Sequence, residues 1–341
     1  MRLVQGNFSQ EEWTALVTRF QDLSLMQTWE YGEAKAQTGP WKVARLVWLE
    51  EDNPVGACQA MVRTLPVLRG GLVWVNRGPL WRRRGEAGGT KLLFQMLAEL
   101  KRFWVDEGRM YLRLALPIEL DEGSGNFPLP PGYAWVPEAR GWASARLNLS
   151  NPIDLLFQKL HQKWRNSLSK ARRLDLSVEY GATDQIFHQI INEYENHLTA
   201  NPYATSISPD FLRILQRLLP QERKLWGVWG MHQGRPLGGI LITRYGYLCE
   251  YIVGAVNTAG RAVNAGNFML WQAMSEMKRL GYHWLDLGGF DPVKTPPGIY
   301  HFKSGLGGTP YRLVGELEAG RGVVSRALRW YIRRRHLGTD G

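Results

Sequence analysis

A chain of 341 residues is long enough for two domains of ordinary size, each with its own hydrophobic core. Hydrophobic residues make up 44% of the sequence and charged residues 21%, which is typical of a globular protein and excludes a disordered one. Lys and Arg total 42 against 31 Asp and Glu, and the resulting charge of +11 favours a polyanionic partner.

Several classes of protein are excluded by what the sequence lacks. It has no apolar run of about 18 residues, as a transmembrane helix needs, and its start, MRLVQGNFSQEEW, lacks the apolar core of a signal peptide. Cys58 and Cys249 have neither the spacing nor the nearby histidines of a zinc site. We therefore expect a cytoplasmic protein with reduced thiols, no metal and no cofactor.

The first half of the chain reads as a helix, three strands, a helix and two further strands. Residues 10–20 form the first predicted helix. Residues 41–66 contain two strands joined by a turn at Asn53 and Pro54, and a third strand follows within 72–81. A helix over 91–108 then precedes strands at 110–116 and 143–150.

The second half repeats this order. A helix over 152–173 can be capped by Ser150 or Asn151 and opened by Pro152. A second helix follows at 184–198, and then a strand, a turn and a strand within 223–246. The last elements are a strand at 247–255, a helix at 267–281 and a strand at 283–289.

The matching order predicts a tandem duplication of one α/β unit. Antiparallel hairpins that lead to a helix and one more strand resemble the acetyltransferase folds of the GNAT type. We therefore expect an α+β protein built from a pair of GNAT-like domains, and acyl transfer becomes the first functional hypothesis, although a fold alone does not establish an activity.

Basic residues gather on the helix predicted for 152–173. Its apolar stripe recurs every four residues, at Leu156, Leu160, Trp164 and Leu168. The neighbouring stripe carries Lys159, Lys163, Asn166, Lys170 and Arg173 with no carboxylate between them. A solvated charged face is the plain alternative, but these like charges repel each other, and an external anion would relieve that cost.

The sequence RALRWYIRRRH, near the end of the chain, also combines basic and apolar residues. Arg326, Arg329 and Arg333 share one face of a predicted helix. Such a helix could touch an anionic membrane surface, or it could dock on the domain through its apolar residues. We favour docking.

The segment LDLGGFDPVKTPPGIYHFKSGLGG, residues 285–308, follows the last predicted strand. Open α/β sheets bind ligands where such loops leave their strands, and glycines let backbone approach a ligand closely. Lys303 could stabilise an oxyanion there, and Asp291 or Asp286 could accept a proton. The plain alternatives are an exposed lysine and an aspartate that holds a turn.

Four motifs together resemble the Fem family of aminoacyl-tRNA-dependent transferases, which build peptidoglycan cross-bridges. They are QTWEYGEAK at 27–35, NRGPL at 76–80, HQKWRNSLSKARR at 161–173 and the glycine-rich segment at 285–308. The resemblance is to the compact members that lack a coiled-coil arm. It implies residues 1–148 with about 318–341 as an acceptor-side domain, and residues 149–317 as an aminoacyl-tRNA-side domain.

The resemblance also assigns roles to residues. It implies that Lys303 stabilises the tetrahedral intermediate and that Lys35 contacts the phosphates of a nucleotide-linked precursor, UDP-MurNAc-pentapeptide or lipid II. We add Trp29, Tyr31 and Arg77 to the acceptor side. The expected tRNA-binding residues are Phe302, Lys159, Lys163, Arg165, Asn166, Lys170 and Arg173. The expected partners are aminoacyl-tRNA and an amine, with a monomer as the expected state and peripheral membrane contact open.

Other acceptors and donors stay open at the level of sequence. Asn201–Ala204 (NPYA) stand where the family usually has basic residues near a substrate groove, so the acceptor could instead be a small-molecule amine. An acyl-CoA N-acyltransferase would need a pyrophosphate loop, for which the chain offers only Arg261, Gly266 and Asn267. A basic RNA-binding module without catalysis would explain the charge but not the segment around Lys303.

Overall fold

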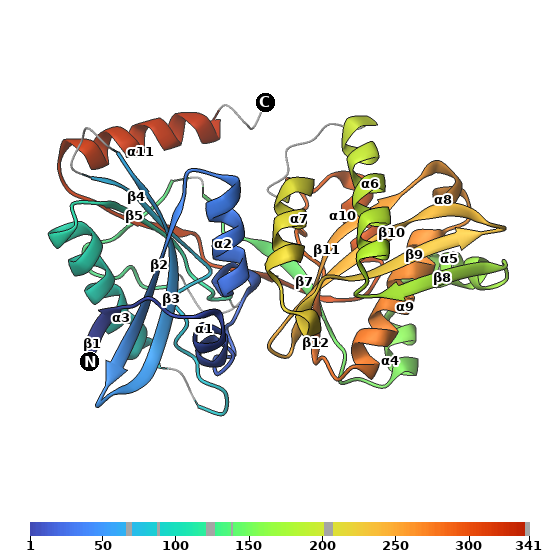
Figure 1. Ribbon diagram of the computed structural model, residues 1–341, viewed down its shortest axis with the longest axis horizontal. Coiled ribbons are helices and arrows are strands. Elements are labelled where there is room, and N and C mark those ends of the chain that lie inside the picture. Colours follow the sequence, from blue (N-terminus) through green and yellow to red (C-terminus); the bar gives the residue numbers. More distant parts are fainter. Residues whose placement is uncertain (66–69, 87–88, 121–126, 138, 201–206, 338–341) are drawn as a thin grey trace. The chain divides into compact units, whose positions relative to one another are not determined.

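The computed structural model describes residues 1–65, 70–86, 89–120, 127–137, 139–200 and 207–337, with side chains described as far as residue 332. The residues NPYA at 201–204 lie outside the described residues. The chain divides into two compact units, Met1–Trp142 with Arg312–Gly341 and Ala143–Tyr311. Each unit is a mixed sheet covered by helices (Figure 1).

Unit 1 contains a sheet in the order β1-β2-β3-β4-β5-β14-β6. The strands are β1 (Arg2–Gln5), β2 (Lys42–Glu50), β3 (Asn53–Thr64), β4 (Gly71–Asn76), β5 (Tyr111–Ala115), β6 (Ala134–Trp135) and β14 (Glu316–Ala319). The helices are α1 (Gln10–Val17), η1 (Leu25–Gln27), α2 (Trp29–Thr38), α3 (Thr90–Lys101), η2 (Arg102–Glu107) and α11 (Gly322–Leu337). β4 and β5 are parallel, whereas β2 and β3 form an antiparallel hairpin.

Unit 2 repeats this plan with a sheet in the order β13-β7-β12-β11-β10-β9-β8. The strands are β7 (Ala143–Asn148), β8 (Leu176–Gly181), β9 (Trp226–His232), β10 (Arg235–Tyr245), β11 (Leu248–Val256), β12 (Trp284–Asp286) and β13 (Thr309–Arg312). The helices are α4 (Ile153–Lys159), α5 (Gln162–Arg172), α6 (Asp184–Ala200), α7 (Pro209–Leu218), η3 (Gln221–Arg223), α8 (Thr258–Ala262), α9 (Ala265–Arg279) and α10 (Pro297–Ser304). β11 and β12 are parallel, as β4 and β5 are in unit 1.

Close helix packing on both faces of a strand occurs in each unit. In unit 1, Gly56 of β3 leaves room for Met96 of α3, while Gln59 meets Gly32 of α2. Successive strand residues point to opposite faces, so α3 and α2 cover opposite sides of the sheet, as Figure 1 also shows. In unit 2, Gly227 of β9 likewise faces α6 and Gly230 faces α9.

Three local features differ from what the sequence predicts. The helix expected over 152–173 breaks at Leu160, whose ψ of 139° is extended, so α4 and α5 are separate helices. Part of the expected glycine-rich loop is helical, since Pro297 starts α10 with its ring already in helical geometry. The strand at 143–148, which we expected to close the first domain, pairs with β12 of the second sheet.

Candidate functional site

Lys303 is buried in α10, with 8% of its surface exposed. Its Nζ donates a hydrogen bond of 3.1 Å to the carbonyl of Gly289 and lies 5.6 Å from the ring centroid of Tyr251. Burial lowers the pKa of Lys303 to about 8, although the carboxylates of Asp286 and Glu250 act to raise it. The plain alternative of an exposed lysine is therefore wrong, and the side chain can change charge near neutral pH.

Asp286 ends β12 and ties three segments together. Its Oδ1 accepts hydrogen bonds from Ser144 Oγ at 2.5 Å and from the backbone N–H of Gly288 at 2.8 Å. Its Oδ2 accepts from the hydroxyl of Tyr311 at 2.5 Å. These bonds make Asp286 the anchor of the turn after β12, and its negative charge favours the ammonium form of Lys303.

Asp291 has a comparable anchoring role one turn later. Its Oδ1 accepts hydrogen bonds from the backbone N–H groups of Val293 at 2.9 Å and Lys294 at 3.1 Å. Its own N–H donates to Thr295 Oγ1 at 2.9 Å. This Asx turn shapes the approach to α10, so both candidate acids hold the frame in which Lys303 sits.

Phe302 and Lys303 are adjacent in α10, and Phe302 is half-buried between two other helices. Its ring centroid lies 6.0 Å from that of Trp164 in α5. On the other side, a Cβ on Gly266, in the first turn of α9, would lie 3.7 Å from the Phe302 ring. Phe302 therefore lies between α5 and the start of α9.

The expected tRNA-binding residues lie on two helices that adjoin α10. Lys159 ends α4, and Lys163, Asn166, Lys170 and Arg173 are exposed on or just after α5. Arg165 is half-buried and donates to Gln158 O and Gln162 Oε1, each at 2.7 Å.

The start of α5 is joined to the end of α10. The N–H of His161 donates to the carbonyl of Gly305 at 2.9 Å, and Gly305 leaves room for the Trp164 ring. The structure thus places the exposed basic residues of α5 in the same compact unit as Lys303, with a packed connection between their helices.

The expected acceptor-side residues lie in unit 1. Trp29, Tyr31 and Lys35 share α2, and Lys35 Nζ lies 5.6 Å from the Tyr31 ring centroid. Burial lowers the pKa of Lys35. Arg77 follows β4 in a left-handed conformation with φ of 53°, and its guanidinium stacks 4.8 Å from the ring centroid of Trp142. Each expected cation is therefore partly withdrawn from water beside an aromatic ring.

A buried amide network positions α2, and the sequence alone did not reveal it. Gln27, fully buried, donates to the carbonyls of Gln59 at 3.1 Å and Asn76 at 2.8 Å, and accepts from the N–H of Gln59 at 2.7 Å. The Gln59 side chain in turn donates to Thr28 O at 2.7 Å and accepts from Arg45 Nε at 3.1 Å. The only sequence signal was an amide inside the QTWEYGEAK motif.

The C-terminal helix α11 is docked on unit 1, as favoured from the sequence. Ser325 is buried, and Arg329 forms an ion pair of 2.8 Å with Glu318 of β14. Val323 and Trp330 remain exposed on the outer side, at 71% and 57%. Contact of this outer side with a membrane surface stays a prediction.

Two kinds of feature are absent from the described part of the chain. No described helix is both long enough and apolar enough to span a bilayer. Likewise, the described residues contain no cluster of three or more His, Cys, Asp or Glu side chains arranged to hold a metal ion. Both cysteines are buried, and burial raises the pKa of each thiol.

Comparison with known proteins establishes the fold. Residues 158–304 match the family model of the acetyltransferase (GNAT) domain. The crystal structure of FemX is similar, with a TM-score of 0.79 at 14% identity over 96% of this chain and 99% of that chain. A tandem GNAT protein from the clavulanic acid biosynthesis pathway has a TM-score of 0.51 at 13% identity over 94% of this chain and 100% of that chain.

A further similar structure is L-PGS from Bacillus licheniformis, with a TM-score of 0.57 at 10% identity over 96% of both chains. No curated protein matches the sequence. The chain is thus a tandem pair of GNAT-like domains, as the repeat in the sequence predicts, and the family match lies on the unit that contains Lys303.

The lowered pKa of Lys303 predicts a specific pH dependence of stability. Between about pH 8 and the ordinary pKa of lysine, the unfolded chain binds more protons at this site, so folding becomes more favourable as pH rises. Lys303→Met removes this gain. The free energy of unfolding of Lys303→Met relative to wild type should therefore fall as pH is raised from 8 to 10 in urea titrations. Lys91→Met, at an exposed site, is the control, and parallel curves for Lys303→Met and wild type would contradict the burial.

The amide network predicts a large stability effect in unit 1. Gln27→Met leaves the N–H and carbonyl of Gln59 without their partner in a buried position, which should lower the free energy of unfolding by about 3 kcal/mol. Urea denaturation measures this loss. Gln95→Met, the same change at an exposed position of α3 in the same unit, should cost under about 0.5 kcal/mol; equal effects of the two substitutions would show that the network is not stabilising.

Proposed function

We propose that the protein is an aminoacyltransferase that moves an amino acid from aminoacyl-tRNA to an amine acceptor, with a peptidoglycan precursor as the expected acceptor. The match of residues 158–304 to an acetyltransferase domain supports acyl transfer as the reaction class. The observation that carries the proposal is the buried cation of Lys303, held on α10 beside Phe302 and next to the basic helix α5.

The chemistry requires little covalent participation by the protein. The ester that joins an amino acid to ribose is already activated, so the acceptor amine can attack its carbonyl once the two are held together. A C–N bond forms, the C–O bond to ribose breaks, and overall one proton passes from the amine to the ribose oxygen. The demanding feature is the oxyanion of the tetrahedral intermediate, which the Lys303 ammonium would stabilise.

The frame around Lys303 suits that task because it limits the side chain's freedom. Gly289 O accepts a hydrogen bond from the ammonium, and Asp286 is itself held by Ser144, Gly288 and Tyr311. Donors fixed before the reaction need no reorganisation when charge develops. Asp286 and Asp291 are engaged in these anchoring bonds, and in the proposal they act as positioning residues.

The tRNA would be bound mainly through its phosphates. Lys159, Lys163 and Lys170 are exposed, and none of them forms an ion pair within the described residues. Phosphate contacts of this kind set position and affinity without reading sequence. Phe302, half-buried next to Lys303, is suited to stack on a terminal base and so to bring the ester to the lysine.

The acceptor would be bound by unit 1, where Lys35 and Arg77 could meet phosphates. A small-molecule amine is the alternative acceptor. For an acyl-CoA donor, the candidate residue Arg261 already donates to Val256 O at 2.6 Å and Thr258 Oγ1 at 2.9 Å, which reduces its availability to a pyrophosphate. A panel of charged tRNAs and acyl-CoA esters, each offered with a muropeptide precursor and an amine pool, separates these hypotheses.

The proposal predicts how transfer responds to pH and to substitution of Lys303. Lys303→Met should reduce transfer by about 100-fold or more, the usual effect of losing one oxyanion donor. Because the ammonium is the active form and the pKa of Lys303 is about 8, kcat/KM of wild type should decline above that pH.

Lys303→Arg is the matched variant because its charge persists above pH 8. It should retain part of the activity and lack the decline. Full transfer by Lys303→Met would remove the lysine from the mechanism. RNA binding without turnover of any donor would favour the non-enzymatic alternative.

The basic helix makes a separate prediction. Lys163→Glu with Lys170→Glu should raise the KM for aminoacyl-tRNA and lower the slope of log affinity against log salt by about 1 for each phosphate that is no longer neutralised. Lys91→Glu with Arg235→Glu changes net charge equally at exposed sites elsewhere. If both double variants behave alike, α5 does not contact the RNA.

A further inference from the structure

The outer side of α11 presents apolar, aromatic and basic side chains together on an exposed surface of unit 1. Val323, Trp330 and Tyr331 have 71%, 57% and 49% of their surfaces exposed. Arg326 and Ala327 are exposed between them. These five positions follow Val323 at spacings of three, four, seven and eight residues, so they lie on one side of the helix. We call this set the outer face of α11.

The opposite side of α11 attaches the helix to unit 1. Ser325 is buried, Leu328 is half-buried, and Arg329 forms its ion pair of 2.8 Å with Glu318 of β14. The helix also contacts β4 and β5, beside which it lies in Figure 1. The inner side therefore accounts for docking, and a different reason is needed for the apolar residues of the outer face.

The segment that contains α11 is strongly basic. Residues 319–339 include arginines at 321, 326, 329 and 333–335 and no Asp or Glu. Two of these arginines have acidic partners in unit 1, because Arg321 Nε lies 3.1 Å from Asp106 and Arg329 is paired with Glu318. The others add positive charge that no acidic residue of the segment balances, and Arg326 carries part of it onto the outer face.

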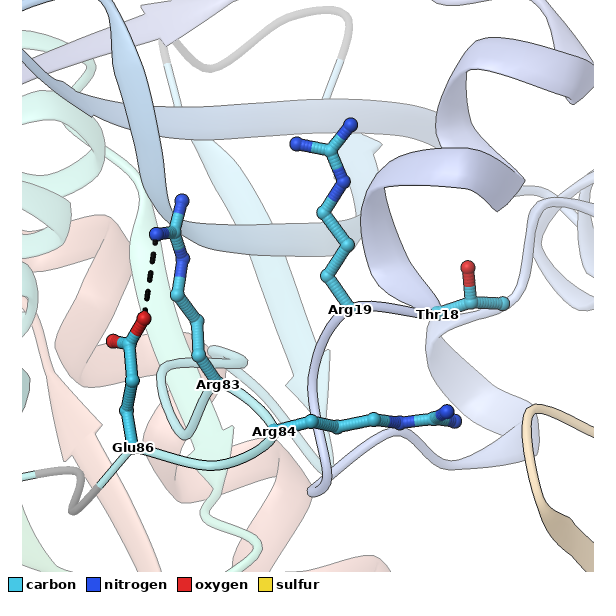
Figure 2. A pocket seen from close by; sticks show the side chains of 5 residues that line it. All are labelled: Thr18, Arg19, Arg83, Arg84 and Glu86. Carbon is cyan, nitrogen blue, oxygen red and sulfur yellow. Dashed lines mark ion pairs between the residues drawn. The ribbon is translucent and has the colours of Figure 1, made fainter.

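A second basic surface in unit 1 lacks the apolar residues. At the end of α1, Arg19, Arg83 and Arg84 border a shallow hollow together with Glu86 (Figure 2). Arg83 donates to Pro54 O and pairs with Glu86 at 3.6 Å, while Arg84 points away from the other two arginines. That surface is a solvated charged face. The outer face of α11 differs because its basic residues flank exposed apolar ones.

We propose that the outer face of α11 binds the surface of an anionic lipid bilayer. Trp330 and Tyr331 each combine an apolar ring with a polar tip, and such side chains favour the headgroup level of a membrane. Val323 and Ala327 would enter to the same shallow depth, while arginines of the segment meet lipid phosphates. The helix would lie in the plane of the interface and stay docked on unit 1.

Two other partners fit this face less well. An RNA backbone favours cations along the line of contact, whereas the centre of the outer face is apolar, at Val323, Ala327 and Trp330. A symmetric contact between two copies of the chain would bring two arginine-rich helices together, and their like charges would repel. A bilayer with acidic headgroups suits both the apolar centre and the basic flanks.

Flotation of the full chain with lipid vesicles tests the proposal. Vesicles of phosphatidylcholine and phosphatidylglycerol in equal parts supply an anionic surface, and vesicles of phosphatidylcholine alone are the neutral comparison. Partitioning to the anionic vesicles should be about tenfold stronger or more, since each arginine near such a surface contributes about fivefold. Added salt should weaken it.

Substitution of the apolar residues separates insertion from plain charge attraction. Val323→Ser with Trp330→Ser should weaken partitioning to anionic vesicles by about tenfold or more, because it removes the side chains that enter the interface. The matched control is Leu129→Ser with Leu280→Ser, which removes two exposed apolar side chains elsewhere and should behave as wild type does. Circular dichroism and the thermal midpoint verify that all forms are folded.

The charge of the face is tested in the same assay. Arg326→Gln should weaken partitioning by about fivefold, whereas Arg235→Gln, at an exposed position of unit 2, should have no effect. Equal partitioning to anionic and neutral vesicles, or unchanged partitioning by the Val323 and Trp330 double variant, would overturn the proposal. So would a wild type that does not float while the double variant loses tRNA binding or a dimer, which would assign the face to RNA or to a second copy. Vesicle binding needs no turnover, so its failure and that of the proposed aminoacyl transfer are separate results.

Discussion

The burial of one ammonium group constrains the whole second unit. Removing Lys303 from water disfavours its charged form, and the lowered pKa records that cost. Only a fixed set of oxygens can offset it, and Gly289 O and the Asp286 carboxylate provide them. Asp286 is itself held by Ser144 on β7 and by Tyr311, which follows α10. The pairing of β7 with β12, the turn after β12 and the Asx turn at Asp291 therefore all help to position Lys303.

The two units share one plan of strands and helices. Both have an antiparallel hairpin, a third strand, a helix and a parallel strand, yet their buried polar groups differ. Unit 2 buries a cation that can change charge near neutral pH. Unit 1 buries the neutral amides of Gln27 and Gln59, whose hydrogen bonds specify geometry without titrating, beside charged groups such as Arg45 and Glu318. This division fits the proposed separation between transfer in unit 2 and acceptor binding in unit 1.

Local pattern predicted much of the fold, because strand and helix periodicities are local signals. It also placed Asp286 and Lys303 in one candidate segment, and the structure brings their charges close to each other. The pairing of β7 with β12 could not be foreseen, since it depends on contacts more than a hundred residues apart. Helix α10 was not predicted, because the glycines and prolines of residues 285–308 are typical of a loop. The contact between the end of α1 and residues 82–84 depends on a bridge between Phe20 and Arg83, for which the sequence offers no signal.

A crystal structure with a charged RNA end whose ester is replaced by a phosphonate tests the central claim most directly, because the phosphonate mimics the tetrahedral oxyanion. The account predicts a phosphonate oxygen within hydrogen-bonding distance, about 2.7–3.1 Å, of Lys303 Nζ, with Phe302 against the terminal base. A phosphonate bound elsewhere, with Lys303 still directed only at Gly289 O, would contradict it.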